Sequence, residues 1–334
     1  MPCGQATVKK KEIKKHNLTH IPHAPWCNHC VEGRMTKDKS LTVPKSQREQ
    51  RGGIIIQVDF FEYHDLRIIC MVETTSSYLF ARVVETKEVT GTLDPKVQLV
   101  ENFIRELVAK IVTLQSDSET TVQTICKLAA ERFKFEDDTK AAQITTRVTS
   151  PHSSKSNGSV ERAIRLIRDQ LRVMFGYLTH KFNIVFSPTT KFIPWLVRHA
   201  CWLINRCIQK SDKQTRFEHH FKREYKKINL YGFLEPVAVV PDNRTKEKHT
   251  MKLYKKTQVG LYLGRVERNN QNLIMVEDGN IIKAHAVKNI WLSKPEMLKI
   301  LNPLQHIHEI MLFIERTYMQ DDINCVHTPS NIYR

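Results

Sequence analysis

The order of predicted strands and helices between residues 54 and 174 constrains the fold more than any other feature of this sequence. Continuous apolar runs indicate buried strands, and apolar side chains three and four residues apart indicate amphipathic helices. The pattern predicts three strands, a helix, and two further strand-helix pairs, in the order Ile54–Phe60, Leu66–Glu73, Tyr78–Val84, Pro95–Lys110, Ile111–Gln115, Glu119–Phe133, Ile144–Val148 and a final helix whose apolar stripe is Val160, Ile164, Ile167, Leu171 and Met174. This order is typical of an α/β fold that opens with an antiparallel run of strands.

Acidic residues mark three positions in this pattern. Asp59 interrupts an apolar strand near its end, where a buried carboxylate is costly unless it is paired or bound to a cation. Asp117 follows the short strand Ile111–Gln115, and Glu161 lies in the first turns of the last helix. Each has an ordinary structural explanation, such as a helix cap for Asp117 and a favourable helix-dipole contact for Glu161. An acid at a strand end before a helix is a recurrent metal-binding position in α/β folds, and the coincidence of acids at two strand ends and on one helix makes the three residues informative together.

A group of cations lies close to Glu161 in the sequence. Lys155 precedes the last helix, and Arg162, Arg165 and Arg168 lie on it. Guanidinium groups bind phosphate oxygens in a two-pronged geometry, so these residues are candidates for contacts with a nucleic-acid backbone. Solvated helix charge explains them equally well from the sequence alone.

The N-terminal segment shows the spacing of metal ligands. His16 and His20 are separated by three residues, and Cys27 and Cys30 by two. Histidines four positions apart share one face of a helical turn, so two nitrogens and two thiolates can converge on one ion. A segment this short needs such a cross-link to fold, and the pattern therefore predicts a structural zinc site.

Two features of the same segment leave alternatives open. His23 and His29 are spare candidates for the zinc ligand set. Lys9–Lys15 is a basic arm, which suits either a nuclear-import signal or a tail that contacts phosphates.

The net charge of +17 is distributed unevenly along the chain. Residues 1–53 hold 11 Lys and Arg against 4 Asp and Glu, and residues 208–292 hold 17 against 9, whereas residues 54–207 hold 20 against 17. Basic flanks around a nearly neutral centre are expected when the flanks grip a polyanion and the centre keeps carboxylates for chemistry. A generically basic surface is the alternative explanation.

Length and composition restrict the class of protein. A chain of 334 residues is expected to form two or three domains. No apolar run approaches the roughly 20 residues that span a bilayer, and the lysine-rich start lacks a signal-peptide core, so we expect an intracellular protein without a membrane partner. Four cysteines inside apolar segments are expected to be small buried residues rather than disulfide partners: Cys70, Cys126, Cys201 and Cys207.

The motifs, taken in their order along the chain, resemble those of a known family. The sequence around Asp59 (V-D-F), Asp117 (L-Q-S-D-S-E) and Glu161 (N-G-S-V-E-R-A) resembles the Asp, Asp, Glu signature of retroviral-type integrases, specifically those of copia-type retrotransposons. The His and Cys pairs followed by V-E-G-R resemble the zinc-binding segment ahead of the core in these elements. Phe192–Arg206 is similar to their core-closing helix, and Val259–Trp291 to their small C-terminal barrel of the Src-homology-3 type.

The resemblance implies an α/β, ribonuclease H-like core with a mixed five-stranded sheet, between a small zinc-binding segment and a small all-β barrel that binds DNA. The expected divisions are residues 1–36 for the basic arm and zinc-binding segment, 37–53 for a linker, 54–210 for the catalytic core, 228–292 for the barrel and 293–334 for a helical tail of unknown role.

The resemblance also implies a function. Asp59, Asp117 and Glu161 would be catalytic and hold two Mg²⁺ or Mn²⁺ ions, and Zn²⁺ would be a separate, structural ion in the N-terminal segment. The chain would trim the 3′ ends of a retrotransposon and join them to target DNA, as a homo-oligomer on DNA in the nucleus, with a cytoplasmic stage during transposition. Two alternatives share most of these residues: a domesticated or decayed relative that binds DNA without catalysis, and a two-metal nuclease on the same fold.

Overall fold

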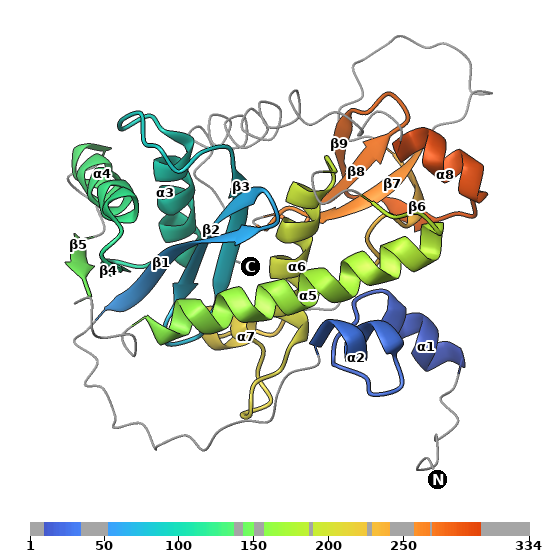
Figure 1. The fold of residues 1–334 in the computed structure, drawn as a ribbon, viewed down its shortest axis with the longest axis horizontal. Helices are drawn as coiled ribbons and strands as arrows, with labels where there is room; N and C mark the ends of the chain where they lie inside the picture. Colours follow the sequence, from blue (N-terminus) through green and yellow to red (C-terminus); the bar gives the residue numbers. More distant parts are fainter. Residues whose placement is uncertain are drawn as a thin grey trace.

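The computed structural model describes residues 10–34, 53–136, 143–149, 157–186, 190–225, 229–240, 257–267 and 269–301. Figure 1 shows two sheets with helices around them, and the helical pair α1 (Lys10–Asn17) and α2 (Asn28–Arg34) near the N-terminal end. Most of the expected linker, Lys155 and most of the expected helical tail lie outside the described residues. None of the described helices has the length and apolarity needed to cross a membrane.

The first sheet has the predicted mixed architecture. Its strands are β1 (Ile54–Tyr63), β2 (Leu66–Glu73), β3 (Leu79–Val84), β4 (Ile111–Ser116) and β5 (Gln143–Val148). Their order across the sheet is β3-β2-β1-β4-β5. β1 pairs antiparallel with β2 and parallel with β4, and β5 extends the parallel part. This is the strand order of a ribonuclease H-like core, so the predicted fold class is confirmed.

Helices cover both faces of this sheet. They are α3 (Pro95–Leu107), α4 (Thr120–Glu136), α5 (Gly158–Phe182) and α6 (Ile193–Cys207). In Figure 1, α3 and α4 lie together on one side of the sheet and α5 runs along the other. The stripe predicted for the last helix, from Val160 to Met174, is buried along α5. Burial of this stripe holds the long helix against β1 and β2.

The ends of β1 and α3 differ from the predicted ones by three residues each. β1 continues past Phe60 because its antiparallel ladder with β2 extends as far as Tyr63, and Asp59 therefore lies inside the strand instead of near its end. α3 ends at Leu107 because Val108 adopts a left-handed backbone conformation, with φ of 51°.

A second, antiparallel sheet follows α7 (Arg216–Phe221). Its strands are β6 (Pro236–Val239), β7 (Gln258–Arg265), β8 (Asn272–Val276), β9 (Ile281–Ala284) and β10 (Val287–Asn289). Their order is β10-β6-β7-β8-β9, and α8 (Lys294–Leu301) comes after them in the chain. This all-β unit lies within residues 228–292, where the small barrel was predicted.

One hydrophobic core runs from the first sheet into the second. Leu261 and Leu263 of β7 and Met275 of β8 belong to the same buried cluster as the strands of the first sheet. α6 packs against both β3 and β7, and its Trp195 and Trp202 are buried. The two units are therefore joined by a packed interface.

The cysteines predicted to be buried are free thiols in the described part of the chain. Cys70, Cys126 and Cys201 are buried, and Cys207 is half-buried.

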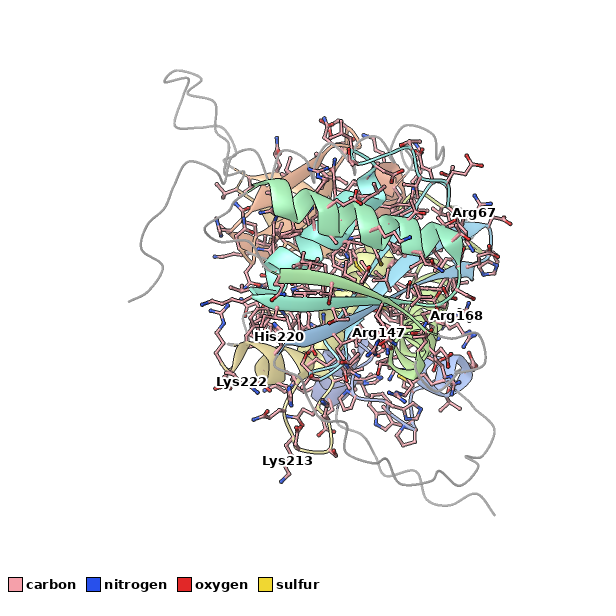
Figure 2. All side chains as sticks on the ribbon, turned by 90° about the vertical axis from the view of Figure 1, so that its left-hand side faces the viewer. Arg67, Arg147, Arg168, Lys213, His220 and Lys222 are labelled. Atoms are coloured by element: carbon pink, nitrogen blue, oxygen red, sulfur yellow. The ribbon has the colours of Figure 1, made fainter. Side chains whose placement is uncertain are left out.

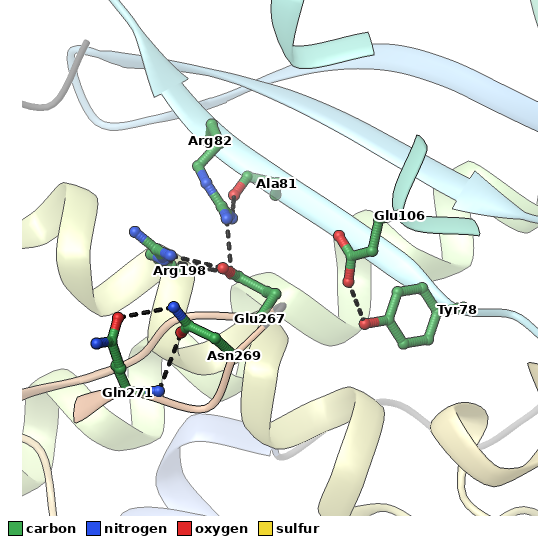
Figure 3. Close-up of polar contacts among 8 residues, drawn as sticks. All are labelled: Tyr78, Ala81, Arg82, Glu106, Arg198, Glu267, Asn269 and Gln271. Carbon is green, nitrogen blue, oxygen red and sulfur yellow. Dashed lines mark hydrogen bonds and ion pairs between the residues drawn. The ribbon is translucent and has the colours of Figure 1, made fainter. Parts of the chain in front are cut away.

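Buried ion pairs reinforce the interface between the units. Figure 3 shows Glu267, after β7, between two arginines of the first unit. Its carboxylate lies 2.7 Å from Arg82 of β3 and 2.6 Å from Arg198 of α6. Burial alone would raise the pKa of Glu267, but the two guanidinium groups outweigh it and bring the pKa to about 2. The carboxylate is therefore ionised at neutral pH and fixes the second sheet to the first.

Candidate active site

Parallel pairing brings Asp59 and Asp117 to the same end of the ladder between β1 and β4. Gln57 of β1 lies opposite Gln115 of β4 in the last pair of the parallel ladder. Asp59 and Asp117 each come two residues after these glutamines. Because parallel strands run in the same direction, residues at equal distances beyond a pair emerge at the same end.

The acidic group at this end contains one residue that the sequence did not single out. Ligand oxygens of Asp59, Asp117 and Glu119 all lie within 4.8 Å of one another, and the three residues are half-buried. The Asp117 Oδ1 accepts a hydrogen bond from the Glu119 backbone N–H at 2.9 Å, which turns Glu119 back toward Asp117. Carboxylate oxygens at such separations suit Mg²⁺ or Mn²⁺, which are hard cations with oxygen ligands. The residues present therefore fit a divalent metal ion.

Electrostatics at Asp59 support this fit. Burial is the largest cause that raises the pKa of Asp59 to about 6, and the neighbouring Asp117 carboxylate adds to it. Glu119 and Glu161 raise the pKa further, against a hydrogen bond from the Phe60 backbone N–H. Carboxylates that disfavour one another's charge are stabilised by a shared cation.

Glu161 lies beside this group but outside its closest set. It is an exposed residue of the first turn of α5, and its charge contributes to the raised pKa of Asp59. Among the described residues, the set whose oxygens lie within 4.8 Å of one another includes Glu119 and not Glu161. The three acids singled out in the sequence thus come into one neighbourhood, with Glu161 at its rim.

Two buried glutamines hold the start of α5 next to the acids. The Gln57 Oε1 accepts hydrogen bonds from the backbone N–H groups of Ser159 at 3.1 Å and Val160 at 2.9 Å. The Gln115 Nε2 donates to the Asn157 Oδ1 at 3.1 Å. A side chain of the sheet thereby satisfies amides that have no partner inside the helix. Sequence analysis missed both glutamines, although Gln57 is conspicuous as a polar residue inside an apolar strand.

The cationic candidates lie along α5. Arg162 and Arg165 are exposed, whereas Arg168 donates to the Glu62 backbone carbonyl at 3.2 Å and lies over the Phe61 ring. Lys155 lies outside the described residues. In the view of Figure 2, Arg168 of α5 and Arg147 of β5 are both labelled.

The four predicted zinc ligands come together. Ligand atoms of His16, His20, Cys27 and Cys30 lie within 4.8 Å of one another, and all four residues are buried. The Cys30 Sγ is 3.2 Å from His16 Nε2, and the Cys27 Sγ is 3.5 Å from His20 Nδ1. Ordinary Zn–S and Zn–N bonds at a tetrahedral ion separate such atoms by about 3.6 Å. The donor set and its spacing fit Zn²⁺, and the spare candidates His23 and His29 are outside this set.

Burial shifts the protonation equilibria of this group. Burial is the main cause that lowers the pKa of His20 to about 3 and raises the pKa of Cys30 to about 11. A neutral imidazole is the form that ligates a metal, whereas a thiol must lose its proton when one binds. Metal binding at this group is therefore coupled to the release of protons.

The helical pair packs directly on α5. Gly33 of α2 lies so close to Val173 that an added Cβ would be 2.5 Å from the Val173 Cγ2. The Gln170 Nε2 donates to the Thr19 backbone carbonyl at 2.9 Å, and Arg34 donates to the Gln170 Oε1. α5 therefore carries Glu161 near its start, and its middle packs against the segment that holds the His/Cys group.

Comparisons with known proteins give only weak similarities to solved structures. Neither a protein-family model nor a curated protein sequence matches the chain. Among solved structures, the chain is similar to the catalytic core domain of BIV integrase, with 18% identity, a TM-score of 0.34, and coverage of 50% of this chain and 93% of that chain. It is also similar to a chain of a simian T-cell lymphotropic virus intasome, with 16% identity, a TM-score of 0.34, and coverage of 74% and 84%. These values do not assign the chain to a family, and its fold class rests on its own strand order.

Proposed function

We propose that this chain is an integrase that transfers phosphoryl groups on DNA, with Asp59, Asp117 and Glu161 as its catalytic residues. The observation that carries the proposal is the pair of aspartates just beyond the last parallel pair of the adjacent strands β1 and β4 of a ribonuclease H-like sheet. Glu161 at the start of α5 completes the set. Two divalent cations bound there would activate the attacking oxygen and neutralise the leaving oxygen.

The chain's own groups supply ligand oxygens and position the substrate. Asp59 holds its carboxylate on β1 and Asp117 directly after β4, and Gln57 keeps the start of α5 close to them. In joining, a 3′-hydroxyl oxygen of one DNA end bonds to a target phosphorus. The target's own 3′ oxygen leaves and takes up a proton. This exchange needs no covalent link to the protein.

DNA is the partner in this proposal. Arg162 and Arg165 are exposed next to Glu161 and would contact phosphates near the reacting bond, with Lys155 and Arg168 as further candidates. The basic flanks of the chain would bind the remaining backbone. We further propose that the protein acts as a homo-oligomer on paired DNA ends in the nucleus and derives from a copia-type retrotransposon.

Zinc at His16, His20, Cys27 and Cys30 is part of the proposal. The purified protein should contain about one Zn²⁺ per chain, and a chelator should unfold residues 16–34 before the core. Hydrogen exchange would follow the unfolding, and Cys27→Ser should abolish zinc retention. Unchanged exchange and no released metal after chelation would contradict the zinc site.

The proposed activity is tested with oligonucleotides that mimic DNA ends, a target duplex and Mn²⁺. Covalent joining of an end to the target is the expected result. Cleavage without joining would instead indicate the nuclease alternative, and binding without either reaction would indicate a relative that has lost catalysis. Glu161→Gln should abolish joining; if joining persists, Glu161 is not catalytic.

A further inference from the structure

Glu119 is the third member of the acidic group, although it lies in the loop between β4 and α4. It follows β4 on the turn after Asp117, and it precedes α4, which begins at Thr120. Its carboxylate is part of the set of three whose oxygens lie within 4.8 Å of one another. A third carboxylate at this distance adds like-charge repulsion to the group. A nearby cation offsets this repulsion.

One compensating cation is visible. Lys87, in the loop between β3 and α3, places its Nζ 3.4 Å from the Glu119 Oε1. The same Nζ lies 5.7 Å from the centre of the Phe60 ring, and Phe60 follows Asp59 in β1. The two side chains of this ion pair are each about one third exposed, at 35% and 32%. The ammonium group therefore sits at the partly open edge of the acidic group, and moving away breaks only this ion pair and the contact with the Phe60 ring.

We propose that Glu119 is an exchangeable metal ligand, paired with Lys87 when the site holds no divalent cation and released from Lys87 to bind one. The proposal rests on the proposed function, because it presumes a metal site at Asp59 and Asp117. It adds a fourth carboxylate and a lysine that competes with the metal for it. Since a divalent cation carries twice the charge of the ammonium group, it wins this competition at adequate concentration.

Titration calorimetry of the full chain with Mn²⁺ tests the exchange. Glu119→Gln should weaken Mn²⁺ binding on the order of tenfold, because a ligand charge is lost. Lys87→Gln should tighten it by roughly threefold, because the competing cation is gone. In the Glu119→Gln background, the Lys87 substitution should change the affinity by less than about twofold, since its effect passes through Glu119.

Matched variants separate this effect from changes in overall charge or folding. Glu131→Gln and Lys127→Gln remove exposed charges from α4, outside the acidic group, and should leave Mn²⁺ affinity unchanged. Without metal, the thermal unfolding midpoints of all these variants should match that of the wild type within about 2 °C.

The outcomes distinguish this inference from the proposed function. If Asp117→Asn abolishes Mn²⁺ binding while Glu119→Gln leaves it unchanged, the metal site stands and the role of Glu119 is refuted. If Lys87→Gln has the same effect with and without Glu119, the exchange is refuted. If the wild type binds no Mn²⁺, both the inference and the metal site of the proposed function fail.

Discussion

At the scale of single residues, Gln57 links the sheet to the helix that carries Glu161. Its side chain accepts two backbone hydrogen bonds at the start of α5. Gln57→Met keeps the length of the side chain but removes the acceptor, so the two amides lose their partner. We expect a loss of stability of about 1–3 kcal/mol, and reduced DNA joining with unchanged Mn²⁺ affinity.

The control for this substitution is Gln98→Met, whose hydrogen bond to the Leu93 carbonyl is exposed. Its effect on stability should stay within about 0.5 kcal/mol in chemical denaturation. Equal effects of the two substitutions, or full joining activity of Gln57→Met, would show that Gln57 does not position α5.

His199 gives the protein a specific response to acid. It is buried in α6, neither ring nitrogen has a hydrogen-bond partner, and burial, together with Arg265, lowers its pKa to about 3. Below its ordinary pKa of 6.5 the unfolded chain binds a proton that the folded chain excludes. The contribution of His199 to stability is therefore fully present above that pH and is lost as pH falls toward 3.

Replacement by a neutral side chain should remove this dependence. Between pH 7 and 5, the wild type should lose about 2 kcal/mol more stability than His199→Leu. Thermal unfolding at the two pH values provides the measurement. Parallel losses in the two proteins would mean that His199 is not buried in its neutral form.

The sequence predicts those functional residues whose role follows from the residues next to them in the chain. Asp59 and Asp117 could be predicted because each follows or interrupts an apolar strand. Gln57 could not, because its partner Ser159 is 102 positions away and the bond exists only once α5 packs on β1. Glu119 is the first residue of a predicted helix, where an acidic side chain is explained by a favourable interaction with the helix dipole.

At the scale of elements, α5 joins the acidic group to the His/Cys group. Contact between α2 and α5 depends on Gly33, whose added Cβ would be 2.9 Å from the Val173 backbone nitrogen. Gly33→Ala should therefore push α2 off α5, at a cost of about 1–3 kcal/mol. Gly176→Ala is the matched control on α5, since its Cβ would be an ordinary 3.6 Å from the His29 Nδ1.

Thiol reactivity reports the docking of α2. In the presence of a weak chelator, Cys27 and Cys30 should react faster with a thiol reagent in Gly33→Ala than in the wild type. Gly176→Ala should react like the wild type and gain up to about 1 kcal/mol of helix stability. Equal reactivity of the two variants would contradict close packing at Gly33.

Periodicity predicted α5 well because its apolar stripe is long and continuous. It did not predict the end of α1. α1 ends at Asn17, so His16 lies in the helix while His20 lies beyond it with φ of 52°. The His20 N–H still donates to the His16 carbonyl at 2.7 Å, which closes a single turn and brings both imidazoles to the cysteines. The four side chains therefore come together as predicted, although His16 and His20 do not share the face of one helix.

At the scale of the whole molecule, the second sheet is part of one packed body with the first. Its position could be predicted from the order of motifs, but its attachment could not. Arg82, Arg198 and Glu267 come from three distant segments, and each reads as an ordinary charged residue in the sequence. Their ion pairs and the continuous apolar core fix the distance between the acidic group and the second sheet.

The proposed function requires that Asp117 act in covalent joining and not only in folding or DNA binding. The most direct test compares the wild type with Asp117→Asn at equal Mn²⁺ concentration, with a DNA end and a target duplex. The account predicts joined product with the wild type and at least about a thousandfold less with Asp117→Asn, while DNA affinity and unfolding temperature stay unchanged. Equal joining by the two proteins, or no joining by the wild type, would contradict it.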